Sequence, residues 1–151
     1  MVKIMVKIEI KEEYDIVIAR VSAKEEAKKL GFGIVDRTRI AKAVSELARN
    51  IVDYAGEGVI EINIVRTEAV EGGSSSRSER HGAFERLGLE IIAEDNGPGI
   101  EDVEKALEDG FSTSGGLGIG LGGVRRLMDE FEILSNVGEG TKVRVVKWKR
   151  I

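Results

Sequence analysis

The chain has no cysteine and a single histidine, His81. Without cysteine there can be no disulfide framework, no thiolate metal site and no cysteine nucleophile. One histidine also excludes a metal centre built from several imidazoles. Any metal that acts here is therefore expected to have oxygen ligands.

Long apolar runs and a dominant charge are missing as well. No window is apolar enough to span a bilayer, and the N-terminus alternates apolar and charged residues instead of forming a signal peptide. The formal net charge is −4 with both signs interspersed, so there is no broad basic surface for nucleic acid. We therefore expect a soluble, cytoplasmic protein with nucleotide or protein partners. With 42% hydrophobic residues, the 151 residues are expected to form one domain, 1–151.

Hydrophobic periodicity predicts the order of the elements. Strict alternation over 2–10 predicts a strand with one buried face, and helical spacing predicts a helix over 13–30 that ends at Gly31. A second helix is predicted from Asp36, as its N-cap, to about Gly56. Further predicted elements are strands over 59–65, 87–94, 131–137 and 141–148, a short helix over 101–108, and a helix that follows the glycines of 115–123. This order favours an α/β sandwich with a mostly antiparallel sheet covered by helices on one face.

One segment has the composition of a loop. Residues 72–86 are rich in glycine, serine and scattered charges, which cannot bury enough apolar surface to hold one conformation. We expect a mobile loop there, with His81 exposed to solvent. Such a loop should be dispensable for ligand binding.

Two polar residues of the second predicted helix could act on one ligand. Glu46 and Asn50 are four residues apart and thus share a helix face. A neutral amide oxygen at Asn50 suits Mg²⁺, which takes few protein ligands when phosphates and waters complete its shell. Glu46 would then be free to accept a proton. An isolated pair of this kind is more often a solvated surface pair.

Two glycine-containing stretches suit a nucleotide. Asp95 follows a buried strand and could accept from an exocyclic amine, and Gly97 and Gly99 would let the backbone approach a flat base. Taken alone, this stretch is also an ordinary turn. Glycines over 115–120 leave backbone N–H groups free to face phosphate oxygens before a helix. The lysine of a P-loop and the βαβ context of a Rossmann fold are both missing.

Four motifs in one order resemble the GHKL ATPase superfamily. Glu46-Leu47-Ala48-Arg49-Asn50 resembles its N box, 95–99 its first glycine box, 116–120 its second, and Gly138-Glu139-Gly140-Thr141 its final motif. Within that superfamily the chain is similar to the RsbT-type serine/threonine switch kinases of the bacterial stressosome, notably at Tyr54-Ala55-Gly56 and 108–118. The likeness covers the chain except 72–86, where those kinases have a shorter connection.

The resemblance implies a Bergerat fold that binds Mg²⁺ and ATP under a lid, which we expect at 110–123 and mobile without nucleotide. By motif, Glu46 would be the general base, Asn50 the Mg²⁺ ligand and Asp95 the adenine-binding residue. The other nucleotide-contacting residues would be Gly97, Gly99, Ser112, Thr113, Ser114, Gly115, Gly116, Leu117, Gly118, Ile119, Gly120 and Thr141.

The resemblance also implies partners. The substrates would be STAS-domain antagonist proteins of the RsbS or RsbR kind, and a PP2C-type, RsbU-like phosphatase would be activated by the released kinase. Related anti-sigma kinases dock their antagonist through an arginine on the first helix, where Arg20 stands here. A solvated helix arginine is the plainer interpretation of Arg20.

Four other functions share parts of this pattern. A histidine-kinase catalytic module acts on a histidine of an attached helix pair, and the gyrase, chaperone and mismatch-repair ATPases act with further domains. An anti-sigma factor with kinase activity remains open. A non-catalytic nucleotide switch also remains, although retention of Glu46 argues against it because binding alone needs no base.

Overall fold

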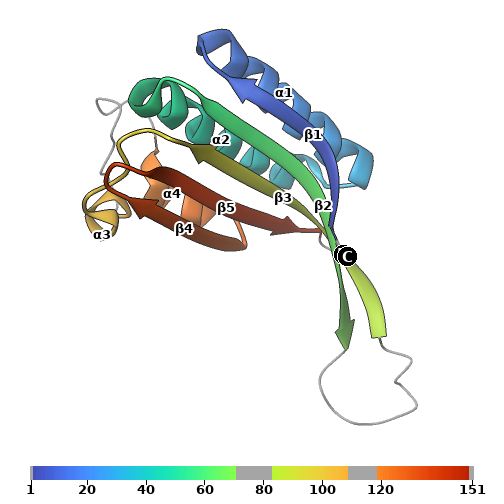
Figure 1. Cartoon of the computed structure of the whole chain (residues 1–151). Coiled ribbons are helices and arrows are strands. Elements are labelled where there is room, and N and C mark those ends of the chain that lie inside the picture. Colours follow the sequence, from blue (N-terminus) through green and yellow to red (C-terminus); the bar gives the residue numbers. More distant parts are fainter. Residues whose placement is uncertain (1, 71–82, 109–118, 150–151) are drawn as a thin grey trace.

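The structure is a computed structural model that describes residues 2–70, 83–108 and 119–149. Five strands form one antiparallel sheet in the order β1-β2-β3-β5-β4 (Figure 1). They are β1 (Val2–Ile10), β2 (Gly58–Val70), β3 (Ala83–Asp95), β4 (Glu130–Asn136) and β5 (Gly140–Trp148). The prediction of an antiparallel-rich α/β sandwich is confirmed.

The helices cover one face of this sheet (Figure 1). They are α1 (Glu13–Leu30), α2 (Ile34–Asn50), its continuation as the π-helical turn η1 (Ile51–Ala55), α3 (Val103–Ala106) and α4 (Gly120–Leu127). α2 lies between α1 and α4, and α3 stands at the end of the sheet where β3 finishes. In the described part of the chain no helix is long and apolar enough to cross a membrane.

The core lies between the helices and the face of the sheet that they cover. Alternate strand residues such as Ile60, Ile91 and Val145 are fully buried there, which is the outcome the period-two pattern predicts. α1 contributes the small residues Ala19, Ala23 and Ala27, which are also fully buried. Small side chains at this spacing let α1 pack closely on α2.

The second helix begins earlier than predicted. Its N-cap is Gly33, not Asp36, because Gly33 is extended (φ −71°, ψ 170°) and the helix starts at Ile34. Asp36 is buried in the first turn, where its carboxylate pairs with Arg39 at 3.1 Å and lies 3.9 Å from the Nζ of Lys147. Buried Lys147 donates to the Leu127 carbonyl oxygen at 2.9 Å, so it ties the end of α4 to β5.

The predicted loop over 72–86 is partly a strand, and that prediction was wrong for residues 83–86. β2 and β3 run further than their apolar pattern suggested, with Thr67 paired to Arg86 and Val70 to Ala83. The two strands project beyond the sheet as a ribbon (Figure 1). Backbone pairing holds polar residues in a strand here, which alternation alone could not reveal. Residues 71–82, including His81, and most of the predicted lid, residues 109–118, lie outside the described residues.

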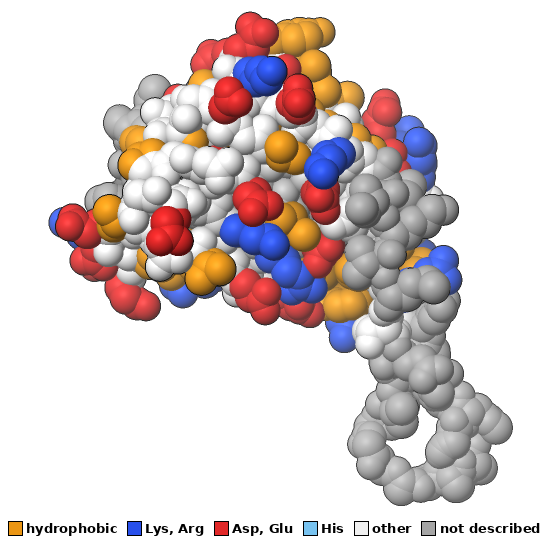
Figure 2. Space-filling view, in the orientation of Figure 1, with side chains coloured by type: hydrophobic (Ala, Val, Ile, Leu, Met, Phe, Trp, Pro, Cys, Tyr) orange, Lys and Arg blue, Asp and Glu red, His pale blue; other side chains and the backbone are white. Residues whose placement is uncertain are grey.

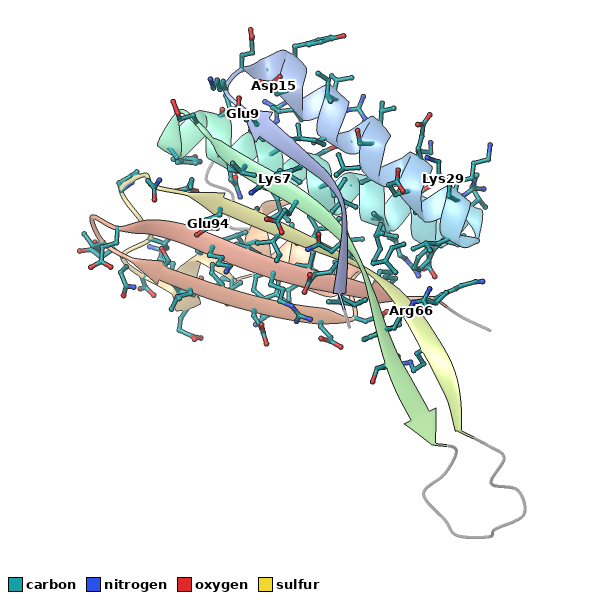
Figure 3. The ribbon with its side chains drawn as sticks, turned by 45° about the vertical axis from the view of Figure 1, so that its right-hand side comes forward. Lys7, Glu9, Asp15, Lys29, Arg66 and Glu94 are labelled. Carbon is teal, nitrogen blue, oxygen red and sulfur yellow. The ribbon has the colours of Figure 1, made fainter. Side chains whose placement is uncertain are left out.

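The opposite face of the sheet is not covered by helices. Figure 2 shows acidic and basic side chains interspersed on it, with apolar side chains between them. Lys7, Glu9 and Glu94, labelled in Figure 3, belong to this face, and Lys7 pairs with Glu61 at 3.8 Å.

Candidate nucleotide-binding site

A cavity of about 300 Å³ lies between α2, η1, α3 and the adjoining ends of β3 and β5. Its floor is apolar, with Ala93 and Val143 from the sheet and Leu47 from α2. Polar side chains from separate parts of the chain stand around that floor. They are Asn50, Tyr54, Asp95, Glu101, Asp102, Lys105 and Thr141. An apolar cavity with a few convergent polar groups is the usual form of a small-molecule site.

Asp95 is held in place at the end of β3. Its Oδ1 accepts a hydrogen bond from the Gly97 N–H at 2.9 Å, and the residue pairs with Thr141 across the sheet. The Thr141 hydroxyl lies 2.8 Å from the Ser135 Oγ, which in turn accepts from the Ile100 N–H at 2.8 Å. The turn that carries Asp95 is therefore bonded to the β4–β5 hairpin, which fixes the carboxylate relative to the floor.

The glycines of this turn are required by packing. A Cβ on Gly97 would lie 2.6 Å from the Cβ of Ala55, so only a residue without a side chain lets the turn rest on η1. Gly99 has φ +79°, and a Cβ there would collide with the Asn136 carbonyl oxygen. Gly99 lines the cavity, whereas Gly97 faces η1. These glycines thus bring three elements together around Asp95.

Glu46 and Asn50 occupy different places although they share a helix. Asn50 lines the cavity, and Glu46 lies outside the lining formed by the described residues. Glu46 is buried, and its Oε1 accepts from the Ile119 N–H at 3.2 Å, just before α4. Its Oε2 is buried without a hydrogen-bond partner among the described residues. A buried carboxylate oxygen of this kind remains able to accept a proton.

The second glycine stretch is only partly described. Ser112, Thr113, Ser114, Gly115, Gly116, Leu117 and Gly118 lie outside the described residues. Ile119 and Gly120 are described, and Ile119 contacts Glu46 through its N–H. The first turn of α4 supplies Leu121 to the cavity.

Four polar cavity residues were missed by the sequence reasoning: Tyr54, Glu101, Asp102 and Lys105. Tyr54 stands at the rim on η1, and burial, Asp53 and Glu46 raise the pKa of its phenol. The stretch Tyr54-Ala55-Gly56 carries a signal for Tyr54, because the family resemblance includes it without assigning it a role. Lys105 enters from α3 and belongs to none of the four motifs.

A second cavity, of about 450 Å³, opens on the uncovered face of the sheet. Charged side chains line it, and the pairs Lys7–Glu61 and Lys11–Glu9, at 3.8 and 3.7 Å, balance part of that charge. Of the four motifs, only the first glycine box reaches this cavity among the described lining, through Asp95 and Asn96. Arg20 lies elsewhere, exposed on α1, with the exposed apolar residues Val17 and Val21 beside it. The first cavity is therefore the candidate site.

Comparison with known proteins places this chain in a family. Residues 35–150 match the model of the histidine kinase-, DNA gyrase B- and HSP90-like ATPases, and the chain belongs to that family. Its sequence is 52% identical over 143 residues to the serine/threonine-protein kinase RsbT of Bacillus subtilis, covering 95% of this chain and 96% of that one. The predicted GHKL membership is thus confirmed.

More distant relatives agree with this assignment. The chain is 34% identical over 112 residues to an anti-sigma F factor of Caldanaerobacter subterraneus, which covers 72% of this chain and 68% of that factor. A crystal structure of RsbU and RsbW domains from Mycobacterium tuberculosis matches 97% of this chain with a TM-score of 0.53 and 17% identity. This chain spans 34% of that longer chain, and at 17% identity the likeness supports the fold alone.

Proposed function

We propose that the protein is a serine/threonine protein kinase that binds ATP and Mg²⁺ in the 300 Å³ cavity and phosphorylates a STAS-domain protein. One observation supports this most strongly. Asn50, Asp95 and Thr141, from three motifs far apart in the sequence, meet around one apolar floor. The 52% identity to a serine/threonine-protein kinase supports the kinase class that the motifs predicted.

The residues of the cavity divide the binding of ATP between them. The apolar floor of Ala93, Leu47 and Val143 suits the faces of adenine, and the Asp95 carboxylate can accept from its amino group. Asn50 offers a neutral amide oxygen at the cavity wall, a ligand type that Mg²⁺ accepts. When bound, Mg²⁺ neutralises charge on the phosphates as the phosphoryl group is transferred.

Glu46 is the general base in this proposal. The oxygen of a serine or threonine hydroxyl attacks the γ-phosphorus, the bond from that phosphorus to ADP breaks, and the hydroxyl proton passes to Glu46. The buried Oε2 of Glu46 is suited to receive it, because Oε1 is already occupied by the Ile119 N–H at 3.2 Å. This division lets one carboxylate hold the start of α4 and accept a proton.

The test uses labelled ATP, Mg²⁺ and candidate STAS proteins, followed by mapping of the phosphorylated residue. The wild-type protein should label a serine or threonine. Glu46→Gln keeps an oxygen for the Ile119 N–H but removes the proton acceptor, so the rate should fall ~10²–10⁴-fold. ATP affinity should stay within about twofold of wild type, as measured by calorimetry. A Glu46→Gln protein that phosphorylated its substrate at the wild-type rate would remove Glu46 from the mechanism.

We also propose that the released kinase binds and activates a PP2C-type phosphatase, with Arg20 as part of the surface that docks protein partners. Arg20 is exposed beside Val17 and Val21, which gives that surface both charge and apolar area. Arg20→Ala should weaken capture of the STAS substrate and leave ATP affinity unchanged. Equal substrate affinity in the variant would exclude Arg20 from the docking surface.

A second candidate function is an anti-sigma factor that phosphorylates its antagonist. The 34% identity to an anti-sigma F factor favours it. The two functions differ in one observable, which is nucleotide-dependent binding of a sigma factor. A pull-down with purified sigma factors in ADP and in ATP separates them.

A further inference from the structure

Lys105 is the single cationic side chain among the described residues that line the cavity. The same lining includes the carboxylates Asp95, Glu101 and Asp102. A nucleotide brings further negative charge into this space, and like charges repel strongly where little water separates them. A positive charge in the described wall would offset this repulsion, and Lys105 is the side chain that carries one.

The base of the Lys105 side chain is fixed by its helix. The Asp102 side chain accepts the Lys105 backbone N–H at 3.0 Å and so caps α3. At the other end of α3 the buried Ala106 and Leu107 pack into the core. The Leu107 carbonyl oxygen occupies the space that a Cβ on Gly122 would need, so α3 rests against α4. The backbone at Lys105 is thus held in place by contacts at both ends of α3.

We propose that Lys105 binds the phosphate chain of the nucleotide and makes affinity depend on the number of phosphates. Lysine is a common phosphate ligand because its compact charge needs no fixed geometry and its stem can follow the ligand. The proposal rests on the proposed nucleotide site and adds a binding residue outside its four motifs. It also links phosphate binding to α4, because α3 packs against α4. The residue just before α4, Ile119, donates its N–H to Glu46.

The test compares adenosine, ADP and ATP as ligands in calorimetry with Mg²⁺ present. Lys105→Met keeps most of the stem and removes the charge. ATP and ADP affinity should fall about tenfold to a hundredfold, as expected for loss of a charge-assisted hydrogen bond, and adenosine affinity should change less than about twofold. The loss should shrink as salt is raised, because salt screens this attraction. Lys105→Arg, which keeps a charge, should recover most of the ATP affinity.

Lys24→Met, at an exposed position on α1, is the matched control and should bind all three ligands like wild type. An equal loss for adenosine and ATP in Lys105→Met would overturn the proposal and make Lys105 a structural part of the wall. Unchanged ATP affinity would overturn it as well. If the wild-type protein bound neither adenosine nor ATP, the nucleotide site itself would fall, and the Lys105 proposal with it.

Discussion

Gly97→Ala should separate the turn of Asp95 from η1. The new Cβ would lie 2.6 Å from the Cβ and 2.8 Å from the Cα of Ala55, closer than real Cβ contacts, so one of the two elements must shift. Overpacking of this kind costs about 1–3 kcal/mol. In a domain of this size each kcal/mol lowers Tm by about 2–4 °C. ATP affinity should fall too, because Asp95 Oδ1 is bonded to the Gly97 N–H and moves with it.

A double mutant can test whether Ala55 is the residue that clashes with the new side chain. Ala55→Gly alone should cost roughly 0.5–1 kcal/mol as a glycine inside a helical turn. Combined with Gly97→Ala it removes the nearer contact, so the double mutant should be more stable than the sum of the two changes, with a coupling of about 0.5–3 kcal/mol. Gly33→Ala, whose new Cβ would meet no atom within 4 Å, measures a glycine-to-alanine change at a helix N-cap without any clash. Simple additivity in urea unfolding, or a fully stable Gly97→Ala, would refute the packing argument.

Three further outcomes follow from the site and the core. Asp95→Asn should weaken ATP binding about tenfold or more, since an unpaired buried amine costs ~1–3 kcal/mol; unchanged affinity in calorimetry would contradict the adenine role. Asn50→Ala should impair both ATP affinity and phosphoryl transfer, and a variant that lost only one would not fit a metal ligand. Lys147→Met should destabilise the fold by ~1–3 kcal/mol in urea unfolding, because the Leu127 carbonyl loses a buried donor and Asp36 and Asp129 lose a cation at 3.9 and 3.4 Å; an unchanged stability would argue against this link.

Much of the fold was readable from local patterns. The alternation of apolar and polar residues correctly predicted the bounds of β1. The helical spacing of apolar residues, together with Gly31, predicted both ends of α1, because these signals are local in the sequence. The residues of the site were readable where they stood in motifs. Asp95, Asn50 and Thr141 were expected at one ligand and do line one cavity.

The differences have a common physical origin in packing between distant segments. The ribbon of β2 and β3 is held by backbone pairing between the two strands, both of which carry polar residues there. The alternation of apolar and polar residues therefore did not predict it. Lys105 reaches the cavity only because α3 packs against α4, and Tyr54 because a π-helical turn follows α2. The contact of Glu46 with the Ile119 N–H joins residues 73 positions apart. No local pattern records such contacts.

The length of β3 has a practical consequence. This one strand carries Asp95 at its end beside the cavity and Ala83 at the far end of the ribbon, 13 residues in all, which spans about 40 Å at the usual rise per residue. A fluorophore or a surface tether attached at the Ala83 end of β3 would therefore stand well clear of the nucleotide. It could serve as a handle for single-molecule recording of substrate capture, with the chemistry left at the opposite end of the same strand.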